Sequence, residues 1–158
     1  MSDTQTGHQF SAAELATFAA VLDEIIPPSS DARFPGAGFL AGGERLAGII
    51  RLMPGLDLAL ASGIAASDEL ARKRGAASYA ALPAAERGAV LNEVAANDGG
   101  FVPSLMFVAF TTYYVEDRVI EALDLEARPP HPKGFTMGGD DPRLLDPVRR
   151  RDKIYREC

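Results

Sequence analysis

The strongest pattern in the sequence is a run of apolar residues spaced three and four apart, which begins after Ser11 and ends at Pro27-Pro28. This spacing places the apolar side chains on one face of an α-helix. Ser11 with Glu14 three residues later forms a capping box, and the two prolines stop the helix. We therefore predict a helix from Ala12 to Ile26 whose two ends are set by the local sequence.

The other segments of the first 125 residues also favour helix, because alanine and leucine are frequent and β-branched runs are few. No stretch alternates apolar and polar residues as a half-buried strand does. Pro and Gly separate the further predicted helices, at about residues 40–52, 56–74, 83–96 and 103–123. The fold class is therefore all-α: a small bundle of about five helices over residues 1–125, followed by a long irregular, proline-rich C-terminal tail over residues 126–158.

The last predicted helix is unusual because its first half, Leu105 to Phe110, is apolar on every side. A helix without a polar face is enclosed. It either forms the centre of the bundle or has one face covered by another chain. Tyr113 and Tyr114 follow about 100° apart around the helix, so one can face the core while the other points outward as an anchor for an interface.

The tail differs from the bundle in charge. Residues 1–125 hold 8 Lys and Arg against 16 Asp and Glu, whereas residues 126–158 hold 8 against 6. A segment of this length without periodicity is either disordered or ordered by another molecule. It also contains apolar anchors, among them Phe135, Leu144, Leu145 and Tyr155, so we predict that it wraps a partner protein.

Several functional classes find no support in the composition. A net charge of −6 opposes nucleic acid or an anionic membrane surface as the main ligand. Two histidines and one terminal cysteine without metal-ligand spacing indicate no metal site, and we predict no catalytic or cofactor-binding residue.

The start of the chain has no signal peptide, which predicts a cytoplasmic location unless a partner carries the signal. The apolar run 101–115 is shorter than the roughly 20 residues of a membrane span, so no membrane insertion is expected.

Several motifs occur in order along nearly the whole chain. They are Phe10-Ser-Ala-Ala-Glu-Leu with Ile25-Ile26-Pro27-Pro28, Pro35-Gly36-Ala37-Gly38, Leu82 with Arg87 and Leu91, Tyr113-Tyr114 with Leu123, and Pro129-Pro130-His131-Pro132-Lys133-Gly134-Phe135. In this order they resemble the small-subunit family named for gluconate 2-dehydrogenase subunit 3. The chain departs from the pattern of that family because it lacks the twin-arginine signal and a cysteine pair.

The resemblance implies a non-catalytic, chaperone-like subunit that binds, matures and stabilises a large FAD-dependent dehydrogenase of the glucose-methanol-choline type in a heterodimer. The FAD would belong to the partner, which oxidises a sugar or alcohol hydroxyl, and this chain would hold no cofactor. The residues predicted at the interface are Tyr113, Tyr114, Pro129, Pro130, His131, Pro132, Lys133, Gly134, Phe135, Leu144, Leu145 and Tyr155.

Two other functions remain open on the sequence. The chain could be a free-standing helical module that binds a small ligand or a protein, with the tail folded over its own groove. A small enzyme would have to use His131, which two prolines hold in an extended conformation, together with Asp140 or Asp141.

Overall fold

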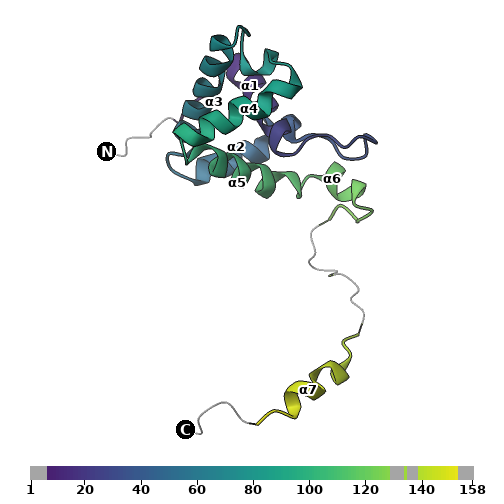
Figure 1. The fold of residues 1–158 in the computed structure, drawn as a ribbon. Coiled ribbons are helices and arrows are strands. Elements are labelled where there is room, and N and C mark those ends of the chain that lie inside the picture. The colour runs from purple at the N-terminus through teal and green to yellow at the C-terminus, as the bar shows by residue number, and fades with distance from the viewer. Residues whose placement is uncertain (1–6, 129–133, 135–138, 153–158) are drawn as a thin grey trace, which may run out of the picture. The chain divides into compact units, whose positions relative to one another are not determined.

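The computed structural model describes residues 7–128, 134 and 139–152, and within these residues every regular element is a helix (Figure 1). The prediction of an all-α fold is confirmed. The chain divides into two units, Met1–Ala127 and Arg128–Cys158.

The first unit is built from six α-helices and two short 3-10 helices in its described part. They are α1 (Ala12–Ile25), η1 (Ala37–Leu40), α2 (Glu44–Leu52), α3 (Leu56–Lys73), η2 (Tyr79–Ala81), α4 (Ala84–Asn97), α5 (Phe101–Tyr113) and α6 (Asp117–Ala122). The helices α1, α3, α4 and α5 contact one another in every pairing, and α2 packs against α3 and α5.

The hydrophobic core lies among these helices, and each of the four mutually packed helices contributes fully buried side chains to it. Among the largest are Phe18 and Leu22 of α1, Leu60 and Ile64 of α3, Val90 and Val94 of α4, Phe101, Leu105 and Tyr113 of α5, and Tyr79 of η2. Asp68 of α3 links α3 to both α1 and η2 by hydrogen bonds. Its Oδ1 accepts a hydrogen bond from the Thr17 hydroxyl and another from the backbone N–H of Tyr79, both at 2.8 Å.

Helix α5 packs against α3 at Gly63, which has no side chain at the contact. A Cβ atom added to Gly63 would lie 1.9 Å from Cδ2 of Phe101, so the ring of Phe101 occupies the space that any other residue would need. Phe101 is fully buried, and in a closely packed interior a ring can move aside only by displacing its neighbours. Gly63 therefore sets the distance between α3 and α5.

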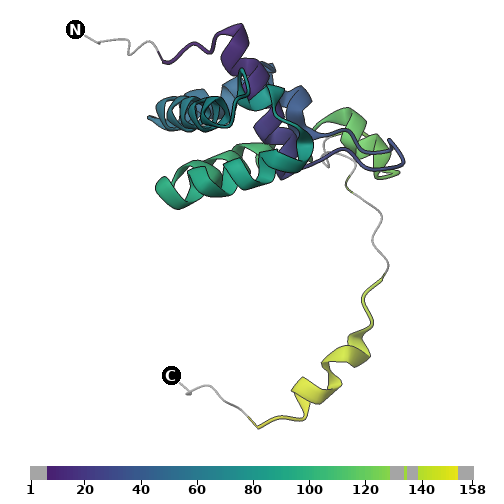
Figure 2. The ribbon, with the colours of Figure 1, turned by 45° about the horizontal axis from the view of Figure 1, so that its top comes forward.

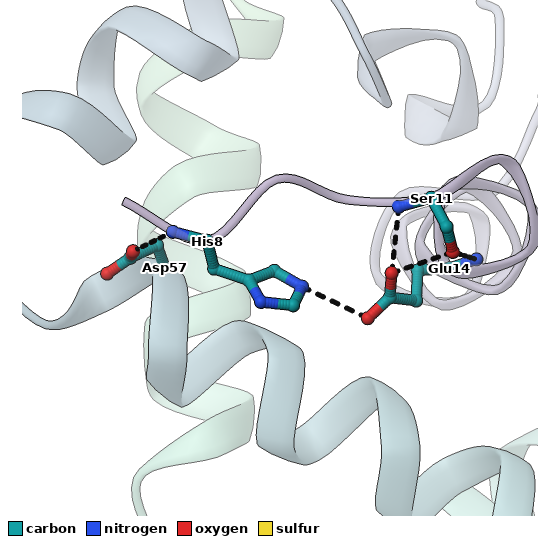
Figure 3. Close-up of polar contacts among 4 residues, drawn as sticks. All are labelled: His8, Ser11, Glu14 and Asp57. Carbon is teal, nitrogen blue, oxygen red and sulfur yellow. Dashed lines mark hydrogen bonds and ion pairs between the residues drawn. The ribbon is translucent and has the colours of Figure 1, made fainter. Parts of the chain in front are cut away.

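The first helix begins as predicted. Its capping box is complete: the backbone N–H of Ser11 donates to Glu14 Oε2 at 2.8 Å, and the N–H of Glu14 donates to the Ser11 hydroxyl at 3.3 Å. Figure 3 shows that Glu14 also meets His8, whose Nε2 lies 3.0 Å from Oε1. On its other side, the backbone N–H of His8 donates to Asp57 Oδ2 at 2.6 Å. The segment before α1 is thus fixed to both α1 and α3.

Two predicted helices differ from the observed ones. The helix expected from residue 40 begins at Glu44, because a separate 3-10 turn occupies residues 37–40. The single helix expected over 103–123 is two helices, since α5 ends at Tyr113 and α6 begins at Asp117 (Figure 1). Thr112 donates its hydroxyl back to the carbonyl of Val108 at 2.5 Å, a bond that weakens and bends helices.

Tertiary contacts hold the short helix α6 in place. Glu116, at its N-cap, has an extended backbone and its carboxylate lies 3.0 Å from Nε of Arg45 in α2. At the other end, Arg33 from the loop before η1 donates to the carbonyl of Ala122 at 2.6 Å, and Figure 2 shows this loop running beside α6. Val119 is fully buried. These contacts lie far apart in the sequence, which is why local periodicity misses the break.

We predict that Gly63→Ala destabilises the protein by roughly 1–3 kcal/mol, because the new methyl group overlaps the Phe101 ring in a closely packed core. Gly48→Ala is the matched control, since an added Cβ at Gly48 of α2 meets no atom within 4 Å. It should stabilise by up to about 1 kcal/mol through helix propensity. Urea denaturation of the three proteins measures both effects, and equal midpoints for the two variants would contradict the proposed crossing.

We also predict that Glu14 makes stability depend on acid pH. Hydrogen bonds from Ser11, and then the contact with His8, hold the pKa of Glu14 below its ordinary value of 4.5. A carboxyl whose pKa is lower in the folded protein stabilises it above the ordinary pKa, and this contribution disappears as the pH falls through the folded pKa.

Glu14→Gln keeps a residue that can complete the capping box but removes the titration. The free energy of unfolding, measured from neutral pH down through pH 4.5, should therefore fall less steeply for this variant than for the wild type. Asp57 titrates in both proteins, so the difference between the two curves isolates Glu14. Parallel curves would show that the Glu14 contacts contribute nothing.

Candidate partner-binding surface

Helix α5 is apolar on two opposite faces, and only one of them belongs to the core. The inner face is buried and consists of Phe101, Leu105, Val108, Ala109, Thr112 and Tyr113. The other face remains exposed in this chain. Of the two arrangements left open by the sequence, the structure therefore supports the one in which a second apolar face is available to another molecule.

We call the large exposed apolar side chains of this face and of the two residues after α5 the α5 stripe. It consists of Met106, Phe107, Phe110, Tyr114 and Val115, whose relative exposures lie between 42% and 51%. The first four recur at the helical spacing of three and four residues. Residues 101–115 contain no charged side chain. Large exposed side chains without charge are typical of the centre of protein interfaces.

Two aromatic rings of the stripe, those of Phe110 and Tyr114, pack against each other, and Tyr114 also packs against Tyr113. The rings of Phe110 and Tyr114 stack, with centroids 6.3 Å apart and planes 7° from parallel. The rings of Tyr113 and Tyr114 form a T-shaped pair, with centroids 5.1 Å apart and planes at 84°. Aromatic side chains that are already ordered lose little conformational entropy on binding, which favours them as interface anchors.

The two adjacent tyrosines have different positions, as the sequence predicted. Tyr113 is 2% exposed and Tyr114 is 51% exposed. The hydroxyl of Tyr113 donates to the carbonyl of Pro35 at 2.7 Å, and burial raises the pKa of this phenol. Tyr113 therefore holds the loop before η1 against α5, while Tyr114 is the member of the pair that a partner can contact.

The described part of the tail contains a short helical segment, η3 (Pro142–Leu145) followed by α7 (Asp146–Arg149), where the sequence predicted irregular structure. Asp141 caps it by accepting the N–H of Arg143 at 3.1 Å. The predicted anchors Leu144 and Leu145 are exposed, and so is Val148 one turn later. This segment thus presents three apolar side chains that its own unit does not bury.

Of the remaining predicted interface residues, the structure describes only Gly134. Gly134 has a left-handed φ of 65°, and its carbonyl accepts a hydrogen bond from Arg128 at 2.6 Å. The others, Pro129, Pro130, His131, Pro132, Lys133, Phe135 and Tyr155, lie outside the described residues. Their role at an interface stays a prediction.

Among the described residues, no three His, Cys, Asp or Glu side chains come together as a metal site. Asp141, one of the two carboxylates considered for an enzyme, is bound by Arg143 at 2.9 Å and 3.0 Å, and Arg143 lowers its pKa.

No single helix in the described ranges has the length and apolarity to cross a membrane. The pair α2 and α3 meets those criteria only when joined across a bend of 116°.

Comparison of the chain with protein-family models, with curated proteins and with solved structures finds no match. The resemblance to gluconate 2-dehydrogenase subunit 3 therefore depends on the sequence motifs alone.

The residues of the α5 stripe other than Tyr114 were absent from the interface predicted from the sequence. One signal for them was present, since Met106, Phe107 and Phe110 continue the spacing of Tyr114 on the side of the helix opposite Leu105. The sequence could not decide which of the two apolar faces the bundle would bury.

We predict that Tyr113→Phe destabilises the chain by about 1 kcal/mol, because the carbonyl of Pro35 loses its hydrogen-bond donor. Tyr114→Phe is the matched control on the exposed side and should change the free energy of unfolding by less than about 0.5 kcal/mol. Thermal and urea denaturation of both variants test the assignment. Equal losses of stability in the two variants would contradict a stabilising role for the Tyr113 hydrogen bond.

Proposed function

We propose that this chain is a non-catalytic subunit that binds a larger protein through the α5 stripe and the C-terminal tail. The observation that carries the proposal is the α5 stripe itself, five large exposed apolar side chains in a stretch of the chain without a charged residue. Exposed apolar surfaces of this kind are typical of sites that bind another protein. Its stacked rings at Phe110 and Tyr114 are of the residue types that dominate binding energy in interfaces.

For the partner, we propose a large FAD-dependent dehydrogenase of the glucose-methanol-choline type that oxidises a sugar or alcohol. This identity derives from the family resemblance, from the opening capping-box motif to the closing motif at Pro129–Phe135. In the complex the flavin and the substrate chemistry belong to the partner, and this chain assists its maturation and stability. The cytoplasmic location stays part of the proposal.

The tail is proposed to add a second area of contact. Leu144, Leu145 and Val148 project from one short helical segment. The nearby Arg143 pairs with Asp141, and Arg149 pairs with Asp146. Residues 139–152 hold four arginines and four aspartates, so their side chains carry no net charge. An exposed apolar helix face of this kind fits an apolar groove on the partner.

Co-expression of the chain with an FAD-dependent dehydrogenase of the glucose-methanol-choline type from the same host tests this function. With the wild-type chain we expect a soluble complex that carries FAD, and without the chain a lower yield of soluble, FAD-loaded flavoprotein. Equal yield and activity in both cases would refute the proposal.

Two alterations locate the interface. Phe110→Asp places a charge in the α5 stripe and should weaken association by roughly tenfold or more, as expected for an anchor residue. Leu52→Asp is the matched control, because Leu52 is an exposed apolar residue of α2 outside the stripe, and it should bind normally. Isothermal titration with the purified flavoprotein measures both affinities.

Truncation after Leu125 removes the tail and should abolish association while the helical content of residues 1–125 is retained. Circular dichroism and the same titration follow the two properties separately. Normal affinity in the truncated chain would remove the tail from the interface and leave the α5 stripe as the binding surface.

The alternative, a free-standing module that binds a small ligand or a protein, makes a different prediction in solution. Size-exclusion chromatography with light scattering would then give a monomer in the presence of the flavoprotein, and the tail of the isolated chain would resist proteolysis.

A further inference from the structure

A cavity of about 660 Å³ lies between the N-terminal segment and the helices α1, α2 and α3. Its volume is within the range of about 300–1,000 Å³ that is typical of small-molecule sites. It shares no residue with the α5 stripe, so it is a second surface with a separate role.

The walls of the cavity are mainly apolar. Phe18 and Leu46, both buried, form its inner part, and Phe10, Ile50, Met53 and Leu58 also line it. Met53 and Leu58 are partly open to solvent, with exposures of 40% and 60%. A ligand that covers these side chains gains from the removal of apolar surface from water.

The polar groups of the N-terminal wall are already paired with one another. The backbone N–H of His8 donates to Asp57, and this bond is the main cause of the lowered pKa of the Asp57 carboxyl. The Glu14 carboxylate, also with a lowered pKa, accepts from Nε2 of His8. Figure 3 shows His8 between Asp57 and Glu14. This wall is therefore preformed, and the negative charge of Asp57 is further offset by the N-terminus of α3.

Arg51 of α2 lines the cavity and forms only a weak ion pair, with Glu44. Its Nη2 lies 3.8 Å from Oε2 of Glu44, and the two side chains are 68% and 96% exposed. An ion pair this long and this exposed contributes little. The guanidinium is therefore free to exchange Glu44 for the carboxylate of a ligand, with which it can form a shorter bidentate pair.

We propose that this cavity binds an amphipathic carboxylic acid, with its hydrocarbon part against Phe18, Leu46 and Ile50 and its carboxylate on Arg51. A purely apolar ligand would use the same walls without the charge contact. A cationic amphiphile would meet Arg51 unfavourably, and Asp57 already accepts the His8 N–H.

The test uses the full chain and sodium decanoate as the probe, with 1-decanol and decylamine as the uncharged and cationic analogues of equal chain length. Isothermal titration at concentrations below micelle formation measures affinity and stoichiometry. We expect one decanoate per chain, bound more tightly than either analogue. Absence of saturable decanoate binding overturns the proposal.

Variants separate the apolar and the ionic parts of the site. Ala47→Phe places a ring in the cavity lining and should reduce decanoate affinity by roughly tenfold or more. Ala65→Phe is its matched control on an exposed position of α3 and should bind like the wild type. Equal affinity of these two variants places the ligand elsewhere and overturns the proposal.

Arg51→Gln tests the ligand class without altering the apolar walls. It should lower the affinity for decanoate by roughly tenfold and leave that for 1-decanol unchanged. A preference for decanoate over 1-decanol that survives in this variant overturns the assignment of the carboxylate to Arg51. Thermal denaturation of each variant in the absence of ligand confirms that it is folded.

Discussion

The contact between the Phe101 ring and the bare backbone of Gly63 is the constraint on which the arrangement of this protein depends. The Phe101 ring occupies the space that a side chain at position 63 of α3 would need, so it packs directly against the α3 backbone. This contact fixes which side of α5 faces α3. That orientation turns Leu105 and Val108 into the core. Successive residues of a helix are about 100° apart, so Phe107 and Phe110 must then face outward.

The two surfaces that follow from this arrangement differ in chemistry. The α5 stripe is exposed and uncharged and contains the stacked rings of Phe110 and Tyr114, which suits a large partner with a complementary apolar patch. The cavity beside the N-terminal segment is concave and combines apolar walls with the guanidinium of Arg51, which suits a small amphipathic acid. Binding at one surface does not use the residues of the other, so each can be tested in the absence of the other ligand.

Local patterns were sufficient wherever a structural element depends on near neighbours. The start of α1 follows from Ser11 and Glu14, which bond within one helical turn, and the all-α fold class follows from apolar spacing. The separation of α5 and α6 was missed because it depends on distant contacts, such as Glu116 with Arg45 and Arg33 with the carbonyl of Ala122. The cavity was missed for a similar reason, since its walls come from four separate segments.

The sequence by itself determined that the chain forms helices, where the first one begins and ends, and that Tyr113 and Tyr114 point in different directions, because each of these depends on local propensity and helical period. Only the tertiary structure decided which apolar face of α5 is buried and which tyrosine reaches solvent. Both faces satisfy the helical pattern equally well. The choice between them is made by packing, when the ring of Phe101 meets a glycine 38 positions earlier in the chain.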